Sequence, residues 1–169
     1  MREGTRHVLA ILLENEPGAL SRVVGLFSQR GYNIDSLSVA PTHDETLSRL
    51  TVSTWGDERT VAQIVKHLNR LIDVVQVADL SEGDHLEREI LLLKVGAVGG
   101  EQRAEIARTV SIFDGKIVDT HPEQYTLQIS GRSDKLDAFI QALGSVSILE
   151  YVRSGIIGMS RSEEDILPG

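Results

Sequence analysis

A weak internal repeat is the feature that most constrains how this chain can fold. An apolar segment at 7–13 precedes a turn and a helix whose positions Leu20, Val23 and Phe27 share one face. A similar apolar segment begins again at 90, about 83 positions later, and a second helix pattern follows it. Because the two copies cover nearly the whole chain, the sequence predicts two small domains of one kind.

Each copy reads as six elements in the order β-α-β-β-α-β, which is the ferredoxin-like arrangement. The predicted fold class is therefore α+β, with two tandem ferredoxin-like domains. The expected strands are 7–13, 34–40, 47–54 and 74–78 in the first copy, and 90–96, 116–121, 125–130 and 148–153 in the second. The four helices are expected at about 20–27, 61–71, 101–113 and 136–143, with Asp57 or Thr60 capping the second and Ser133 the fourth.

The domain boundaries follow from this pattern and from polar segments between the apolar ones. The first domain is expected at 6–80 and the second at 88–161, joined by a polar, acidic linker at 81–87. A polar tail at 162–169 remains, in which Ile166 and Leu167 could dock onto a domain.

Composition excludes several classes of function. The chain has no cysteine, which rules out disulfides, thiolate metal sites and a cysteine nucleophile. A net charge of −8 argues against nucleic-acid binding, which depends on Lys and Arg at phosphates. The longest apolar run, 8–13, is too short to cross a membrane, and no secretory signal is visible. A cytoplasmic location is expected.

No catalytic or metal-binding constellation is found. The histidines are scattered at positions 7, 43, 67, 85 and 121, without an HExxH pattern. No serine lies in a G-x-S-x-G elbow, and the glycines at 96–100 match no nucleotide-binding motif. We therefore expect no catalysis by this chain alone and no metal site.

The turn after the first strand is more informative. Asn15, Pro17 and Gly18 join a buried strand to the beginning of a helix, where main-chain N–H groups lack intrahelical partners. Such a helix end suits a small carboxylate, and a glycine lets a ligand approach the main chain. The same residues would equally make an ordinary tight turn between strand and helix.

Domains of this size also favour association. A domain of roughly 60–80 residues buries only about 60% of its unfolded surface, and a four-stranded sheet has two open edges. We therefore expect a homodimer.

The segment 12–42, LLENEPGALSRVVGLFSQRGYNIDSLSVAPT, closely resembles the start of the small, regulatory subunits of bacterial acetolactate synthase, also called acetohydroxyacid synthase. Ser38, where that family often has Thr, is a mild departure. The resemblance extends over about residues 6–161. Further matches lie at 47–51, 56–57, 71–74, 87–90, 135–139, 153–155 and 158–161.

This resemblance implies an amino-acid-binding ACT domain followed by a second ferredoxin-like domain, in dimers whose ACT sheets join side by side. It also implies a separate large subunit, which holds thiamine diphosphate, Mg²⁺ and FAD and condenses 2-oxo acids in branched-chain amino-acid biosynthesis. The small subunit would carry no cofactor of its own. It would activate the large subunit and confer feedback inhibition by valine.

The resemblance assigns the effector site to residues from two chains. One chain would contribute Asn15, Gly18, Ala19 and Leu20, and its neighbour Asn33 and Ile34. The N–H groups of Ala19 and Leu20 would hold the carboxylate, the two asparagines would orient the polar end, and Ile34 would line the side-chain pocket. Leucine or isoleucine could also bind, since one methylene changes affinity by only about 1–3 kcal/mol. Alternatively, Ile34 is ordinary core and Asn33 only completes a turn.

Two other functions remain as alternatives. A free-standing amino-acid sensor would control transcription or another enzyme, although no helix-turn-helix is visible. A small hydrolase of the acylphosphatase kind would need an arginine in the first strand-to-helix loop, where this chain has Asn15, Glu16 and Pro17.

Overall fold

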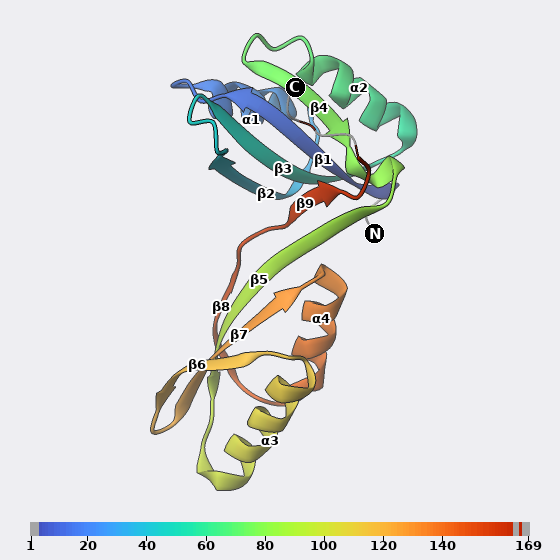
Figure 1. Ribbon diagram of the computed structural model, residues 1–169. Coiled ribbons are helices and arrows are strands. Elements are labelled where there is room, and N and C mark those ends of the chain that lie inside the picture. Colours follow the sequence, from blue (N-terminus) through green and yellow to red (C-terminus); the bar gives the residue numbers. More distant parts are fainter. Residues whose placement is uncertain (1–3, 164–165, 167–169) are drawn as a thin grey trace. The chain divides into compact units, whose positions relative to one another are not determined.

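The computed structural model describes residues 4–163 and 166 (Figure 1). The chain divides into two compact units. The first contains the described residues up to Leu86 and those from Ile156 onward, and the second is Glu87–Gly155.

The first unit is a four-stranded antiparallel sheet with two helices on one face (Figure 1). Its strands lie in the order β2-β3-β1-β4, which makes β2 and β4 the edges. The elements are β1 (Thr5–Glu14), α1 (Ala19–Arg30), β2 (Ile34–Pro41), β3 (Leu47–Gly56), α2 (Glu58–Leu68), β4 (Val74–Asp79) and a short 3₁₀ helix, η1 (Leu80–Glu82).

Local sequence explains both ends of α1 and the start of α2. The α1 helix follows Gly18 and ends at Gly31, and both glycines have a positive φ. The N–H of Tyr32 donates to the carbonyl of Phe27 and closes the helix end. The carboxylate of Asp57 accepts from the N–H of Thr60, which confirms Asp57 as the cap of α2.

The second unit repeats this order. Its sheet has the order β6-β7-β5-β8, again antiparallel throughout. The elements are β5 (His85–Gly96), α3 (Gly99–Ile112), β6 (Lys116–His121), β7 (Gln124–Gly131), α4 (Ser133–Ala142) and β8 (Ile148–Arg153). The predicted α+β class with two ferredoxin-like units is confirmed.

The chain around the expected boundaries is more ordered than the sequence suggested. The 81–87 segment was expected to be a linker, yet it contains the end of η1 and the start of β5. Asp79 accepts from the N–H of Ser81, and Leu80 is buried, so this polar segment folds against the first unit. It is a turn between two strands rather than a free connection.

The C-terminal end differs in a similar way. The expected second domain extended to 161, whereas a further strand, β9 (Ile157–Ser160), belongs to the first unit and pairs with β5. Ile156 packs in a small cluster with Val8, Ala10 and Leu80, and Ile166 packs against that cluster. Thus Ile166 docks as expected, whereas Leu167, in the expected tail at 162–169, lies outside the described residues.

The expected cap of α4 is wrong. Arg132 occupies the N-cap position and no side chain caps the helix, because Ser133 is already its first helical residue. Within the described ranges, none of the helices has the length and apolar character needed to span a membrane.

Candidate functional site

The junction between β1 and α1 is held firmly by the neighbouring loop. The main-chain N–H of Asn15 donates to the carbonyl of Thr46 over 2.8 Å, and its side-chain amide donates to the carbonyl of Glu45 over 3.0 Å. The Asn15 side chain is exposed. Its position is therefore fixed while one side of it faces solvent.

The main chain at the start of α1 is open because of Gly18. This residue has φ +85°, and a Cβ added there would lie 2.9 Å from an Nη atom of Arg22. The N–H of Ala19, one of the two expected carboxylate donors, already donates to the carbonyl of Glu16 over 3.1 Å. The N–H of Leu20 lies in the first turn of α1, where main-chain N–H groups have no intrahelical acceptor. This helix end suits a carboxylate, with Leu20 the better of the two expected donors.

The sequence pattern did not single out Arg22, whose guanidinium lies beside this turn. The guanidinium of Arg22 binds the Asp73 carboxylate through two hydrogen bonds, of 2.5 Å from Nε and 3.0 Å from Nη2. The Asp73 side chain is only 8% exposed, and the hydrogen bond from Arg22 holds the pKa of Asp73 below its usual value. Spacing in the sequence could have identified Arg22, because it lies one helical turn after Gly18.

The other half of the expected site lies elsewhere in the unit. Asn33 is exposed, and its carbonyl accepts from the Thr54 hydroxyl over 2.6 Å. Ile34 is half-buried and packs against the core under the helices.

The register shows how far apart these halves are. Ile34 pairs with Thr54, and Thr54 pairs with His7 near the beginning of β1. Glu14 is seven residues further along β1, which corresponds to about 23 Å at roughly 3.3 Å per residue. One chain therefore does not bring Asn33 and Ile34 to the turn at Asn15.

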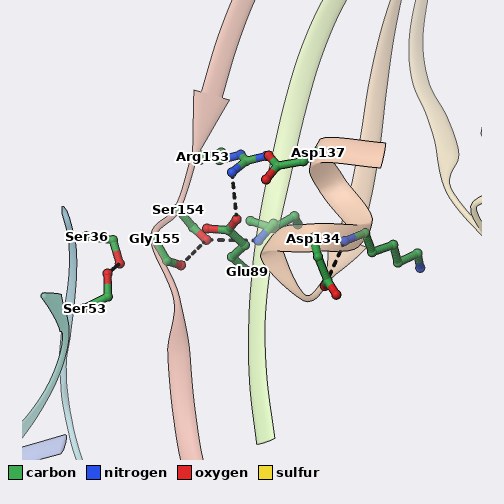
Figure 2. A network of polar contacts seen from close by, with 10 residues as sticks. Ser36, Ser53, Glu89, Asp134, Asp137, Arg153, Ser154 and Gly155 are labelled. Carbon is green, nitrogen blue, oxygen red and sulfur yellow. Dashed lines mark hydrogen bonds and ion pairs between the residues drawn. The ribbon is translucent and has the colours of Figure 1, made fainter. Parts of the chain in front are cut away.

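The second unit contains a separate polar cluster (Figure 2). Arg153 forms ion pairs with Glu89, at 3.3 Å, and with Asp137. These contacts join β5, β8 and α4, and the Glu89 side chain is almost fully buried. The cluster holds three elements together, and no group of three or more potential metal ligands occurs in the part of the chain that the structure describes.

Comparison with known families accounts for both units. Residues 9–76 match the "AHAS small subunit-like ACT domain" family, and residues 88–162 match the family described as "Small subunit of acetolactate synthase". The chain belongs to the acetolactate synthase small-subunit family. The ACT-domain match lies within the first unit, and the other match covers the second unit from residue 88 onward together with β9.

Relatives of this family match along almost their full length. The small subunit of acetolactate synthase isozyme 3 from Salmonella typhimurium is 55% identical over 94% of this chain and 98% of its own. The acetolactate synthase small subunit of Haemophilus influenzae is 58% identical over 96% of this chain and 99% of its own. The crystal structure of the Thermotoga maritima small subunit superposes with a TM-score of 0.85 at 37% identity, over 95% and 99% of the two chains.

Proposed function

We propose that this chain is the regulatory subunit of acetolactate synthase, which activates a separate catalytic large subunit and makes it sensitive to valine. Membership of the small-subunit family and the ACT domain support this role. Thiamine diphosphate, Mg²⁺ and FAD would reside on the large subunit, where the chemistry takes place.

The open main chain at the start of α1 is the main support for placing the effector site there. Gly18 leaves the main chain open, and the N–H of Leu20 would donate to the valine carboxylate. Arg22, whose charge is balanced by Asp73, places an Nη atom beside Gly18 as a further hydrogen-bond donor. The exposed amide of Asn15 would orient the polar end of the ligand. Together these groups recognise a carboxylate without a metal.

A second copy of the chain would complete the site through the edge strand β2. The end of β2, Pro41, pairs with Ser48, and Ser48 pairs with Leu13, so it lies at the same end of the sheet as Asn15. If two β2 strands pair antiparallel about a two-fold axis, the beginning of one lies beside the end of the other. Asn33 and Ile34 of the second copy would then reach the end of the sheet where Asn15 lies.

Exposed apolar side chains on the same elements favour this association. Leu20 and Val24 on α1 and Val39 on β2 are large hydrophobic residues that remain exposed in the single chain. Covering them, and pairing the open edge of β2, would stabilise a dimer. In that dimer Ile34 would contact the ligand side chain, which gives a preference for branched apolar amino acids but little discrimination among them.

Valine can then regulate activity if its affinity differs between two geometries of the dimer. Valine that bridges two copies binds one dimer geometry more tightly than another, and it shifts the equilibrium by that differential affinity. A coupling of about 1–3 kcal/mol would change activity by several-fold to about a hundredfold.

Reconstitution of the enzyme tests this proposal. A purified large subunit is assayed for acetolactate formation alone, with this chain, and with this chain plus valine, leucine or isoleucine. We expect activation by the chain and inhibition by valine. If activity does not change on adding the chain, although the chain still binds valine, a free-standing amino-acid sensor is the better account.

A further inference from the structure

The second unit has a hollow at the start of α4 that the proposed function does not use. Its volume is about 580 Å³, within the range of small-molecule sites. Residues from β5, the end of β7 and the first turns of α4 line it, and Figure 2 shows one of them, Asp134, at the start of the helix. The polar and charged lining residues are Arg88, Ser130, Arg132, Asp134 and Lys135.

Positive charge is concentrated in this hollow. Three cations and one carboxylate line it, which leaves an excess of two positive charges. The second unit as a whole has the opposite balance, with eight Lys and Arg against ten Asp and Glu between 87 and 155. The hollow therefore attracts anions on a unit that otherwise repels them.

Two of the cations are held by groups that do not neutralise them. Arg88 donates to the carbonyl of Glu87 over 2.6 Å, and the Lys135 ammonium donates to the carbonyl of Ser130 over 3.1 Å. A carbonyl fixes the position of a cation but has no net charge. Only Arg132 faces a carboxylate, that of Asp134, at 3.5 Å.

The backbone supports this placement of Lys135. A Cβ at Gly131 would lie 2.7 Å from Cδ of Lys135, so only a glycine lets the lysine stem lie against the end of β7. The positive end of the α4 dipole, at an N-cap that offers no side-chain acceptor, adds to the field of the cations.

From this geometry we infer that the hollow binds the phosphate group of a small metabolite. A phosphate ester carries about −1.5 to −2 charges near neutral pH, which matches the excess of two positive charges. The Arg88 guanidinium can donate to two phosphate oxygens at once. No aromatic side chain lines the hollow, so recognition rests on the phosphate rather than on a stacked ring.

An NMR titration of the full ¹⁵N-labelled chain tests this inference without valine or a large subunit, so its outcome is independent of the proposed function. The probes are inorganic phosphate and glucose 6-phosphate, each added at constant ionic strength against chloride. We expect saturable shifts of the amides of Ser133, Asp134 and Lys135. Tighter binding of glucose 6-phosphate would identify a metabolite site, and equal binding a site for free phosphate.

Variants locate the binding. The double variant Arg88→Gln/Lys135→Gln should weaken phosphate binding by about tenfold or more, since each change removes a charge-assisted hydrogen bond. Lys116→Gln, which removes an exposed cation on β6 outside the hollow, should change it less than about twofold. Shifts that do not saturate, or that survive the double variant unchanged in a chain with an otherwise native spectrum, would overturn the inference.

Discussion

The two units have the same order of elements, yet their central strands are buried differently. In β1 all residues from 8 to 13 are buried, whereas in β5 buried and exposed residues alternate from Glu87 to Leu93. The helices cover one face of each sheet. In the first unit η1, Ile156 and β9 also pack on the other face, where Arg49 donates to the carbonyl of Gly158.

A register shift that occurs in both sheets shows which residues of β1 and β5 are equivalent. The pairing of β1 with β4 shifts between Leu12 and Leu13, and that of β5 with β8 shifts between Lys94 and Val95. Leu12 thus corresponds to Lys94, and Ala10 to Leu92. Leu12 is 0% exposed, but the Lys94 side chain is 39% exposed. Although the fold is repeated, both faces of the first sheet are covered at its central strand, whereas only one face of the second sheet is.

Exchanging these equivalent residues should have the largest effect. Leu12→Lys places an ammonium in a buried position and should lower the free energy of unfolding by about 3 kcal/mol or more. The matched change Lys94→Leu removes only the exposed pair with Glu150 and should cost less than about 1 kcal/mol. Urea unfolding of both variants measures the difference, and equal losses would contradict the comparison.

Substitutions at Ile156 and Ile157 test whether the C-terminal segment stabilises the first unit by covering the second face of its sheet. Ile156 is buried and Ile157 is exposed, although they are adjacent in the chain. Ile156→Ala should destabilise the protein by about 2 kcal/mol or more, because it opens a cavity against Val8 and Ala10. Ile157→Ala should change stability by less than about 0.5 kcal/mol. Similar values for the two variants would mean that the C-terminal strand does not protect the first unit.

Ion pairs of the two units should respond alike to acid but differently to salt. Hydrogen bonds from Arg22 lower the pKa of buried Asp73, and a hydrogen bond from Lys94 lowers that of exposed Glu150. Each contribution is present above the ordinary carboxyl pKa of about 4 and is lost as the pH falls through the lowered pKa of the folded state.

Comparing Asp73→Asn and Glu150→Gln with the unchanged chain between pH 2.5 and 6 checks this behaviour. The Asp73 contribution should persist in 0.5 M NaCl, whereas that of Glu150 should shrink, because salt screens exposed pairs most. If salt affects both equally, the Arg22–Asp73 pair is no better shielded than a surface pair.

Much of this fold is predictable because short-range chemistry determines it. The burial of Val23 and Phe27 on α1, the end of that helix at Gly31 and the cap at Asp57 all follow from residues a few positions apart. Leu20, expected on the same face of α1, is exposed. Burial of the second sheet face is not predictable in this way. Ile90 and Leu92 are as apolar as the residues of β1, and their exposure depends on where distant segments pack.

In the candidate site, too, features that depend on neighbouring residues were predictable, and features that depend on distant residues were not. The open helix start at Gly18 was evident from the turn itself, but the partner of Arg22 is Asp73, whose contact spans 51 positions. Likewise, the use of the Ala19 N–H by Glu16 depends on the conformation of the turn. Ser133 fails as a cap because α4 starts one residue earlier than its side chain suggests.

Calorimetric titration of the purified chain with valine tests whether the start of α1 is the effector site. Gly18→Asp places a carboxylate and a Cβ at the proposed carboxylate position, next to Arg22. Gly25→Asp is the matched control, since a Cβ at this α1 glycine meets nothing within 4 Å. We predict that valine binds the unchanged chain and the Gly25→Asp variant but not Gly18→Asp. Undiminished valine binding by a folded Gly18→Asp variant would contradict the account.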